Sequence, residues 1–322
     1  MLTDLIQRST EYRSIKNSIK SGALSHAYML IGQDTKTRML YTKLIALTCL
    51  CEQGGCYTCN TCQKILNDTH VDVKYYNTDN KMKVKDAETL IEDTYIRGWE
   101  SARKLYFIDN AQDLSPQVQN KLLKIYEEPP EGVSIFMLCN SELGVLQTIR
   151  SRAEKIYAPV FSTEQVYSEL ISEGVDQKMA ETASVFSGGL FDLAYKFVDN
   201  KEYAEIYDMA FDILLNCKKS SDIYRYINCK AFSKENIVTA LDFFEIILRD
   251  IMAIVVGGNT KLSTINRDYD LKIIADGYSA GGVSMAILAL AESRKMLLSY
   301  VSATSVAEKT LFNILEAKYK WQ

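Results

Sequence analysis

Five of the eight cysteines in this chain of 322 residues lie close together, between positions 49 and 62. Two residues separate Cys56 from Cys59 and two separate Cys59 from Cys62, while Cys49 or Cys51 can supply a fourth sulfur atom. Four thiolates at such spacing form the tetrahedral ligand set of structural zinc, whereas a thioredoxin-like redox site uses a single pair. The cluster therefore predicts one structural zinc ion, with Cys49 and Cys51 as alternatives for its fourth ligand.

A second stretch with potential for chemistry follows a short apolar run that ends at Gly32. A phosphate-binding loop here would read Gly-x-x-x-x-Gly-Lys-Ser/Thr, because its glycines let backbone N–H groups surround the phosphates and its lysine reaches the terminal ones. Counted from Gly32, Thr37 stands at the second glycine position. Arg38 stands at the lysine position and Met39 at the hydroxyl position. This degenerate loop predicts that the chain does not use ATP as a cofactor.

The acidic residues that ATP hydrolysis needs are incomplete as well. The apolar run Leu105–Ile108 is followed by Asp109 and Asn110. In a hydrolytic nucleotide-binding domain this strand ends in Asp-Glu: the aspartate holds magnesium and the glutamate positions the attacking water. Asparagine cannot act as a carboxylate base, so Asn110 also favours a chain without ATPase activity of its own.

The elements that position these groups alternate between apolar runs and a helical pattern. Leu105–Ile108 and Val133–Leu138 are unbroken apolar runs, which are typical of strands buried on both faces of a parallel sheet. Between them Ser115 and Pro116 begin a helix as N-cap and first helical residue. Pro129-Pro130 end that helix, since proline cannot continue the hydrogen-bond ladder. The stretch predicts an α/β domain with a parallel sheet flanked by helices.

Two motifs in this stretch resemble a known family. The run NKLLKIYEEPPE at Asn120–Glu131 is similar to the Asn-x-Leu-Leu-Lys-x-x-Glu-Glu-Pro-Pro signature of bacterial DNA polymerase III clamp-loader subunits, which have the AAA+ fold. Ser151-Arg152 resembles the start of the family's Ser-Arg-Cys motif, whose third position is Ala153 here. The resemblance implies an AAA+ P-loop-type α/β domain over residues 1–160, a helical lid over 161–202 and an all-α collar for oligomerisation over 203–322.

The resemblance also implies roles for particular residues. Family members carry an inserted zinc module at about residues 49–62, and the alignment of the helix end favours Cys49 as the fourth ligand over Cys51. Arg152, with Ser151 as its motif neighbour, corresponds to an arginine finger that acts in trans on the ATP of an adjacent subunit, and Arg150, two residues earlier, is a competing candidate. The helix after Gly188-Gly189 lacks the arginine that senses the nucleotide in active members.

Within the family, the loss of the ATP machinery resembles the delta-prime subunits. That likeness implies a non-hydrolysing stator in the DNA polymerase III holoenzyme, which is no enzyme by itself and helps to load the sliding clamp on primed DNA. Its implied partners are the gamma/tau ATPase subunits and the delta subunit. One alternative is a gamma/tau-type ATPase subunit, which the degenerate loop disfavours. Another is a stand-alone zinc-bearing nucleic-acid-binding protein.

The overall composition bears on that last alternative and on location. A net charge of −4 and a pI near 5.5 disfavour a free-standing nucleic-acid binder, which usually has a basic excess. Met1–Leu5 lacks the pattern of a signal peptide, and the most apolar run, Phe243–Val256, is too short and too charged to span a membrane. We therefore expect a cytoplasmic bacterial protein without a membrane partner. From about residue 203 the pattern is helical throughout, with candidate helices at 203–217, 233–256, 283–300 and 304–319.

Overall fold

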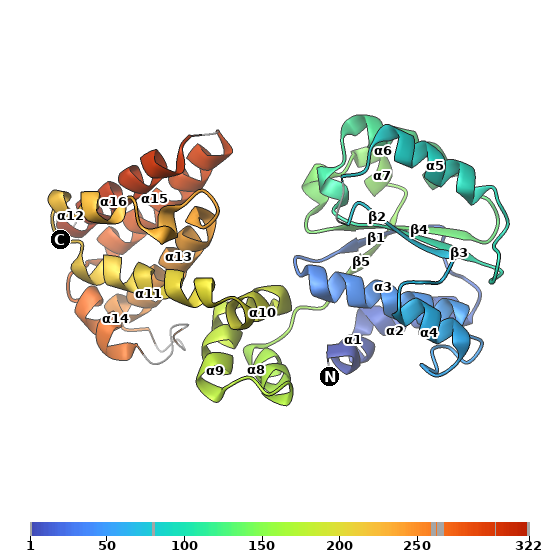
Figure 1. Cartoon of the computed structure of the whole chain (residues 1–322), viewed down its shortest axis with the longest axis horizontal. Helices are drawn as coiled ribbons and strands as arrows, with labels where there is room; N and C mark the ends of the chain where they lie inside the picture. Colours follow the sequence, from blue (N-terminus) through green and yellow to red (C-terminus); the bar gives the residue numbers. More distant parts are fainter. Residues whose placement is uncertain (1, 79–80, 259–261, 263–266, 300, 321–322) are drawn as a thin grey trace. The chain divides into compact units, whose positions relative to one another are not determined.

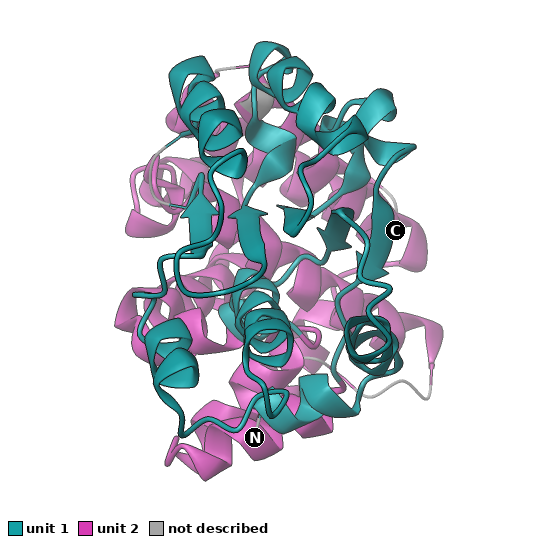
Figure 2. Ribbon diagram, turned by 90° about the vertical axis from the view of Figure 1, so that its right-hand side faces the viewer, with its two compact units in different colours: residues 1–161, 190–192 teal, residues 162–189, 193–322 magenta. Residues whose placement is uncertain are grey.

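The computed structural model describes residues 2–78, 81–258, 262, 267–299 and 301–320, and divides into two compact units (Figures 1 and 2). The first unit comprises residues 1–161 together with 190–192, and the second comprises 162–189 and 193–322. The last residue of the expected helix 283–300 and the end of the expected collar, 321–322, lie outside the described residues. The division of residues 161–322 into lid and collar remains a prediction.

The first unit is built on a parallel sheet of five strands in the order β2-β3-β4-β1-β5. The strands are β1 (Ala27–Ile31), β2 (Val73–Tyr76), β3 (Lys104–Ile108), β4 (Val133–Cys139) and β5 (Glu154–Tyr157). Every residue of β3 and β4 is buried, which confirms the strands that the apolar runs predicted. β1 lies between β4 and β5, with Ala27 opposite Ile135 and Tyr28 opposite Glu154. The predicted α/β fold, a parallel sheet flanked by helices, is confirmed.

Helices cover both faces of this sheet. They are α1 (Leu2–Arg8), α2 (Thr10–Lys20), α3 (Thr35–Leu50), α4 (Asn60–Leu66), α5 (Val84–Thr94), α6 (Pro116–Glu127) and α7 (Gln147–Arg150). Figure 1 shows α1 to α4 on one face and α5 to α7 on the other. Helix α3 begins at Thr35 because the side chain of Asp34 caps it.

Helix α6 shows how the signature run is placed against the sheet. Ser115 Oγ accepts a hydrogen bond from the Val118 N–H at 3.4 Å, and Pro116 follows as the first helical residue, as predicted. Tyr126 is buried and donates from its hydroxyl to the carbonyl oxygen of Tyr28 in β1, at 2.8 Å. The helix ends at Glu127, ahead of the two prolines. Its buried side chains join a core under the sheet that includes Tyr106, Ile135 and Met137.

The second unit is helical in the described residues. Its helices are α8 (Thr163–Ser172), α9 (Gln177–Phe186), α10 (Phe191–Asp199, whose first two residues belong to the first unit), α11 (Lys201–Asn216), α12 (Ser220–Tyr226), α13 (Ile237–Val256), α14 (Asp268–Ala275), α15 (Ala280–Leu298) and α16 (Ala303–Lys320). Aromatic rings fill part of its interior, and the centroid of Phe243 lies 4.6 Å from Phe186 and 5.3 Å from Tyr207.

A helix that spans a membrane must be both long enough and apolar enough. Among the described residues no single helix meets both requirements. Asp268–Ala275 and Ala280–Leu297 meet them only as a pair, by length and composition, with a bend of 105° between them.

Candidate metal centre and degenerate nucleotide site

Four cysteines converge where helix α3 ends. The sulfur atoms of Cys51, Cys56, Cys59 and Cys62 all lie within 4.8 Å of one another, and this group could hold a metal ion. The separations are 3.7 Å between Cys51 and Cys56, 3.8 Å between Cys51 and Cys59, and 3.9 Å between Cys56 and Cys62. A tetrahedron with Zn–S bonds of about 2.3 Å has sulfur–sulfur edges of about 3.8 Å. The cysteines therefore fit zinc in number, chemistry and spacing.

Local backbone geometry brings these sulfur atoms together. Cys51 is the residue that caps the C-terminus of α3, and its extended backbone turns the chain away from the helix axis. Gly54 and Gly55 both have positive φ, which lets the following loop return sharply. Cys59 then caps the N-terminus of α4, where its sulfur accepts the Cys62 N–H at 3.4 Å.

The thiols differ in acidity in the metal-free chain. Hydrogen bonds from the Thr58 hydroxyl and the Cys59 N–H lower the pKa of Cys56 to about 6, whereas burial raises the pKa of Cys62 to about 12. Because the thiolate is the form that binds a metal, cation binding would shift all four groups toward deprotonation.

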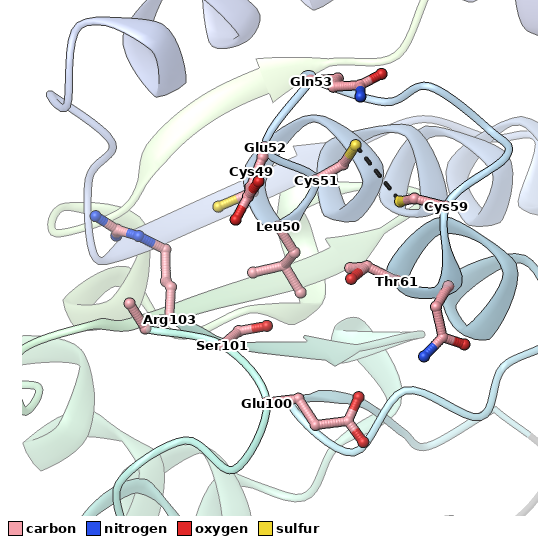
Figure 3. Close-up of a pocket in the computed structure, with 12 residues that line it drawn as sticks. Cys49, Leu50, Cys51, Glu52, Gln53, Cys59, Thr61, Glu100, Ser101 and Arg103 are labelled. Carbon is pink, nitrogen blue, oxygen red and sulfur yellow. Dashed lines mark hydrogen bonds between the residues drawn. The ribbon is translucent and has the colours of Figure 1, made fainter.

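Cys49, which the sequence alignment favoured as fourth ligand, lies outside the cluster. It lies in the last turn of α3, two residues before Cys51, which caps the helix with an extended backbone and is no longer part of it. Figure 3 shows its sulfur directed away from the Cys51–Cys59 pair, in a pocket that Arg103 also lines. Burial raises the pKa of Cys49 to about 11. The expectation is corrected: the structure brings Cys51, the stated alternative, to the cluster.

The degenerate nucleotide site contains a buried ion pair. The Arg38 guanidinium lies 3.1 Å from the Asp109 carboxylate and donates to the Gly32 carbonyl oxygen at 2.6 Å. It also donates to the side-chain oxygens of Thr35 and Asn110, both at 3.3 Å. The arginine at the lysine position therefore points into the fold, onto the strand end that carries the acidic residue.

Gly32 and Thr37 stand at the two glycine positions of the loop. Gly32 allows close packing, and Thr37 is held by hydrogen bonds. A Cβ atom on Gly32 would lie 2.5 Å from the Cβ of Ala158, so the glycine permits close approach of the segment after β5. Thr37 is fully buried, and its N–H and hydroxyl both donate to the carboxylate of Asp34, the N-cap of α3. Sequence reasoning missed Asp34, although an aspartate just before a helix is a capping signal.

Ser151 and Arg152 form the short link between α7 and β5. Ser151 is exposed and donates to the Thr148 carbonyl oxygen at 3.1 Å. Arg152 is 41% exposed, lies 2.8 Å from the Glu127 carboxylate, and donates to the same Thr148 carbonyl at 2.9 Å. Ala153, which replaces the motif cysteine, packs against the hydrophobic core. The structure places the guanidinium at the surface, beside the last residue of α6.

Comparisons with known proteins show similarity to subunits of DNA polymerase III. A family model described as "DNA polymerase III, delta subunit" matches residues 7–161. DNA polymerase III subunit delta' of Bacillus subtilis is 26% identical over 309 residues, which cover 93% of this chain and 94% of the relative. The chain is thus similar, over nearly its whole length, to a DNA polymerase III delta-prime subunit. The family model matches within the first unit, whereas the similarity to the Bacillus subtilis subunit runs almost the full length of both proteins.

A gamma/tau subunit and a solved structure are also similar to this chain. DNA polymerase III subunit gamma/tau of Mycoplasma pneumoniae is 27% identical over 186 residues, which cover 56% of this chain and 26% of that relative. Among solved structures, a gamma-subunit-related protein of Thermotoga maritima is 14% identical, with a TM-score of 0.47, covering 96% of this chain and 99% of that one.

Proposed function

We propose that this chain is a non-hydrolysing delta-prime subunit, which acts as a stator in the DNA polymerase III clamp loader. Its partners are the gamma/tau ATPase subunits and the delta subunit, and the complex places the sliding clamp on primed DNA. The chain contributes no ATPase activity of its own. It instead supplies Arg152 to the nucleotide site of a neighbouring gamma/tau subunit.

The observation that carries the proposal is the buried Arg38–Asp109 pair. Asp109 occupies the strand end at which a hydrolytic relative would hold magnesium, and here its carboxylate receives a guanidinium that is 1% exposed. Asn110 supplies no carboxylate, and Thr37 supplies no glycine. These features support a subunit that does not turn over nucleotide, and they disfavour the gamma/tau-type alternative.

The geometry at Arg152 supports the finger role. An arginine remains charged and presents a planar fork that can bind two phosphate oxygens. Its partner Glu127 is 46% exposed, and a surface ion pair of this kind is worth little energy. The guanidinium can therefore leave Glu127 for a phosphate at low cost.

The experiment is to rebuild the complex with Arg152→Ala and measure clamp-stimulated ATP turnover and clamp loading. A trans-acting arginine contributes roughly 10³–10⁵ in rate to other nucleotide hydrolases, so turnover at the affected interface should fall to background. Arg150→Ala tests the competing candidate two residues earlier and should retain activity. Wild-type turnover and loading in an intact Arg152→Ala complex would contradict the finger.

The cysteine cluster has a structural role in this proposal. We assign to it one zinc ion, held by Cys51, Cys56, Cys59 and Cys62. The loop from Cys51 to Cys59 has few apolar side chains, so the metal would supply stability that packing does not.

A further inference from the structure

Two aspartates cap each other's helices at the degenerate loop. The first N–H groups of a helix have no partner within it and need an acceptor from elsewhere. In α3 the N–H groups of Thr35 and Lys36 donate to the two carboxylate oxygens of Asp192, at 2.5 Å and 3.0 Å. In return the Asp192 N–H, in the first turn of α10, donates to the Asp34 carboxylate at 2.6 Å. We call this reciprocal arrangement of Asp34 and Asp192 the aspartate clasp.

The clasp is joined to the surrounding fold by packing. Residues 190–192 belong to the first unit, although the residues on both sides of them belong to the second. Phe191 is fully buried, and its ring contacts Phe161 edge-on, with 5.0 Å between the centroids. Asp192 is therefore held in place by its neighbour as well as by its own hydrogen bonds.

The position of the Asp192 carboxylate has a chemical meaning. The N-terminus of the helix after the first strand is where nucleotide-binding domains hold phosphate, through exposed N–H groups and the positive end of the helix dipole. Asp192 brings a negative charge with two acceptor oxygens to that place. A phosphate group would supply the same negative charge and acceptor oxygens, but only as part of a bound ligand.

We propose that Asp192 is an internal substitute for phosphate, which keeps the start of α3 closed and residues 190–192 attached to it without a nucleotide. Nucleotide-binding relatives need a ligand to satisfy these N–H groups, whereas this chain satisfies them permanently. The inference goes beyond the clamp-loading role and does not depend on Arg152, because it concerns the isolated chain alone.

Amide hydrogen exchange of the full-length chain tests this proposal. Asp192→Asn keeps one acceptor oxygen but removes the charge, and Asp192→Ala removes both. We expect the amides of Thr35 and Lys36 to exchange roughly 10- to 100-fold faster in these variants, as loss of a hydrogen bond to a charged group implies. Sodium tripolyphosphate, compared with sodium chloride at equal ionic strength, should slow that exchange again in the variants and leave the wild type unchanged.

Asp176 provides a matched control, because it is an ordinary exposed N-cap that accepts the N–H groups of Lys178 and Met179 in α9. Asp176→Ala should speed exchange at α9 without any response to tripolyphosphate. The proposal is overturned if exchange at Thr35 and Lys36 is unaffected by the Asp192 substitutions. It is equally overturned if tripolyphosphate acts no more strongly on the Asp192 variants than on the wild type, since Asp192 would then be only a cap.

Discussion

Arg38 and Asp109 form an ion pair inside the first unit, with 3.1 Å between Nη2 and Oδ1 and side chains only 1% and 4% exposed. Removing one member of such a pair leaves a buried charge without its counterpart, which costs about 3–5 kcal/mol. We expect Arg38→Met to lower the free energy of unfolding by that amount in urea titrations. The double variant Arg38→Met/Asp109→Asn should recover part of the loss.

Arg13→Met is the control for this measurement, because Arg13 is an exposed arginine on α2. It should change the free energy of unfolding by less than about 0.5 kcal/mol. A loss for Arg38→Met no greater than that for Arg13→Met would show that the buried pair does not contribute to stability.

The metal centre predicts a difference between two neighbouring cysteines. Metal analysis of the pure protein should give close to one zinc per chain, because four sulfur atoms lie within 4.8 Å of one another. Cys51→Ser should lose zinc and lower the melting temperature, while Cys49→Ser should retain zinc, since Cys49 lies outside the cluster. Zinc loss in Cys49→Ser with retention in Cys51→Ser would reverse the assignment.

Asp93 predicts a dependence of stability on pH. Burial raises the pKa of its carboxyl, but hydrogen bonds from Lys74, Tyr106 and Lys104 outweigh burial and lower it from 3.8 to about 2. A carboxyl with a lowered folded-state pKa stabilises the fold above its unfolded pKa, and the contribution is lost as the pH falls. The contribution at neutral pH is about 2 kcal/mol, of which roughly half should be gone by pH 3.

Urea unfolding of wild type and Asp93→Asn between pH 6 and pH 3 measures that contribution. The wild type should lose stability more steeply than the variant, whereas Asp113→Asn, at an exposed aspartate, should follow the wild type. Any loss of zinc at low pH affects all three chains alike. Parallel curves for wild type and Asp93→Asn would refute the role of Asp93.

The close packing at Gly32 predicts that an added side chain destabilises the fold, independently of any phosphate binding. A Cβ there would approach the Ala158 Cβ to 2.5 Å, so Gly32→Ala should cost about 1–3 kcal/mol through overpacking. Adding Ala158→Gly in the same chain removes the clashing methyl group and should restore much of the stability. If Gly32→Ala alone were neutral in thermal unfolding, β1 and the segment after β5 would not be in close contact.

In contrast to Gly32, Arg152 is expected to contribute little to the stability of the isolated chain. Its ion pair with Glu127 is exposed on both sides, at 41% and 46%, so Arg152→Ala should change the free energy of unfolding by less than about 1 kcal/mol. Thermal unfolding of the variant checks this before any complex is assembled. A large destabilisation would mean that lost activity in the complex reflects misfolding.

Local signals predicted the central part of the fold. Ser115-Pro116 and Pro129-Pro130 bounded α6, and the apolar runs located β3 and β4, because capping chemistry and burial on both faces are properties of neighbouring residues. β5 was not anticipated: three of the four residues in Glu154–Tyr157 are exposed, and pairing with β1 makes the segment a strand. β2 was missed for a similar reason, since all its residues are only partly buried.

The candidate sites show the same limit. The sequence spacing identified Cys56, Cys59 and Cys62 as metal ligands. The fourth ligand depends on the residue at which α3 ends. The helix ends at Leu50, so Cys51 turns toward the cluster. Arg38 was identified as a replaced lysine, yet its partner Asp109 lies 71 residues later. Asp192 was not identified, because no local pattern links it to Thr35, which lies 157 residues earlier.

The order of the strands has a consequence for how the chain is made. β1 is the first strand to leave the ribosome, but both of its neighbours, β4 and β5, are among the last, since Ala27 pairs opposite Ile135 and Tyr28 opposite Glu154. Long-range parallel pairing is slow, and unpaired apolar strands are prone to aggregate. A nascent chain that stops before β4 therefore carries the apolar strand β1 with neither edge paired.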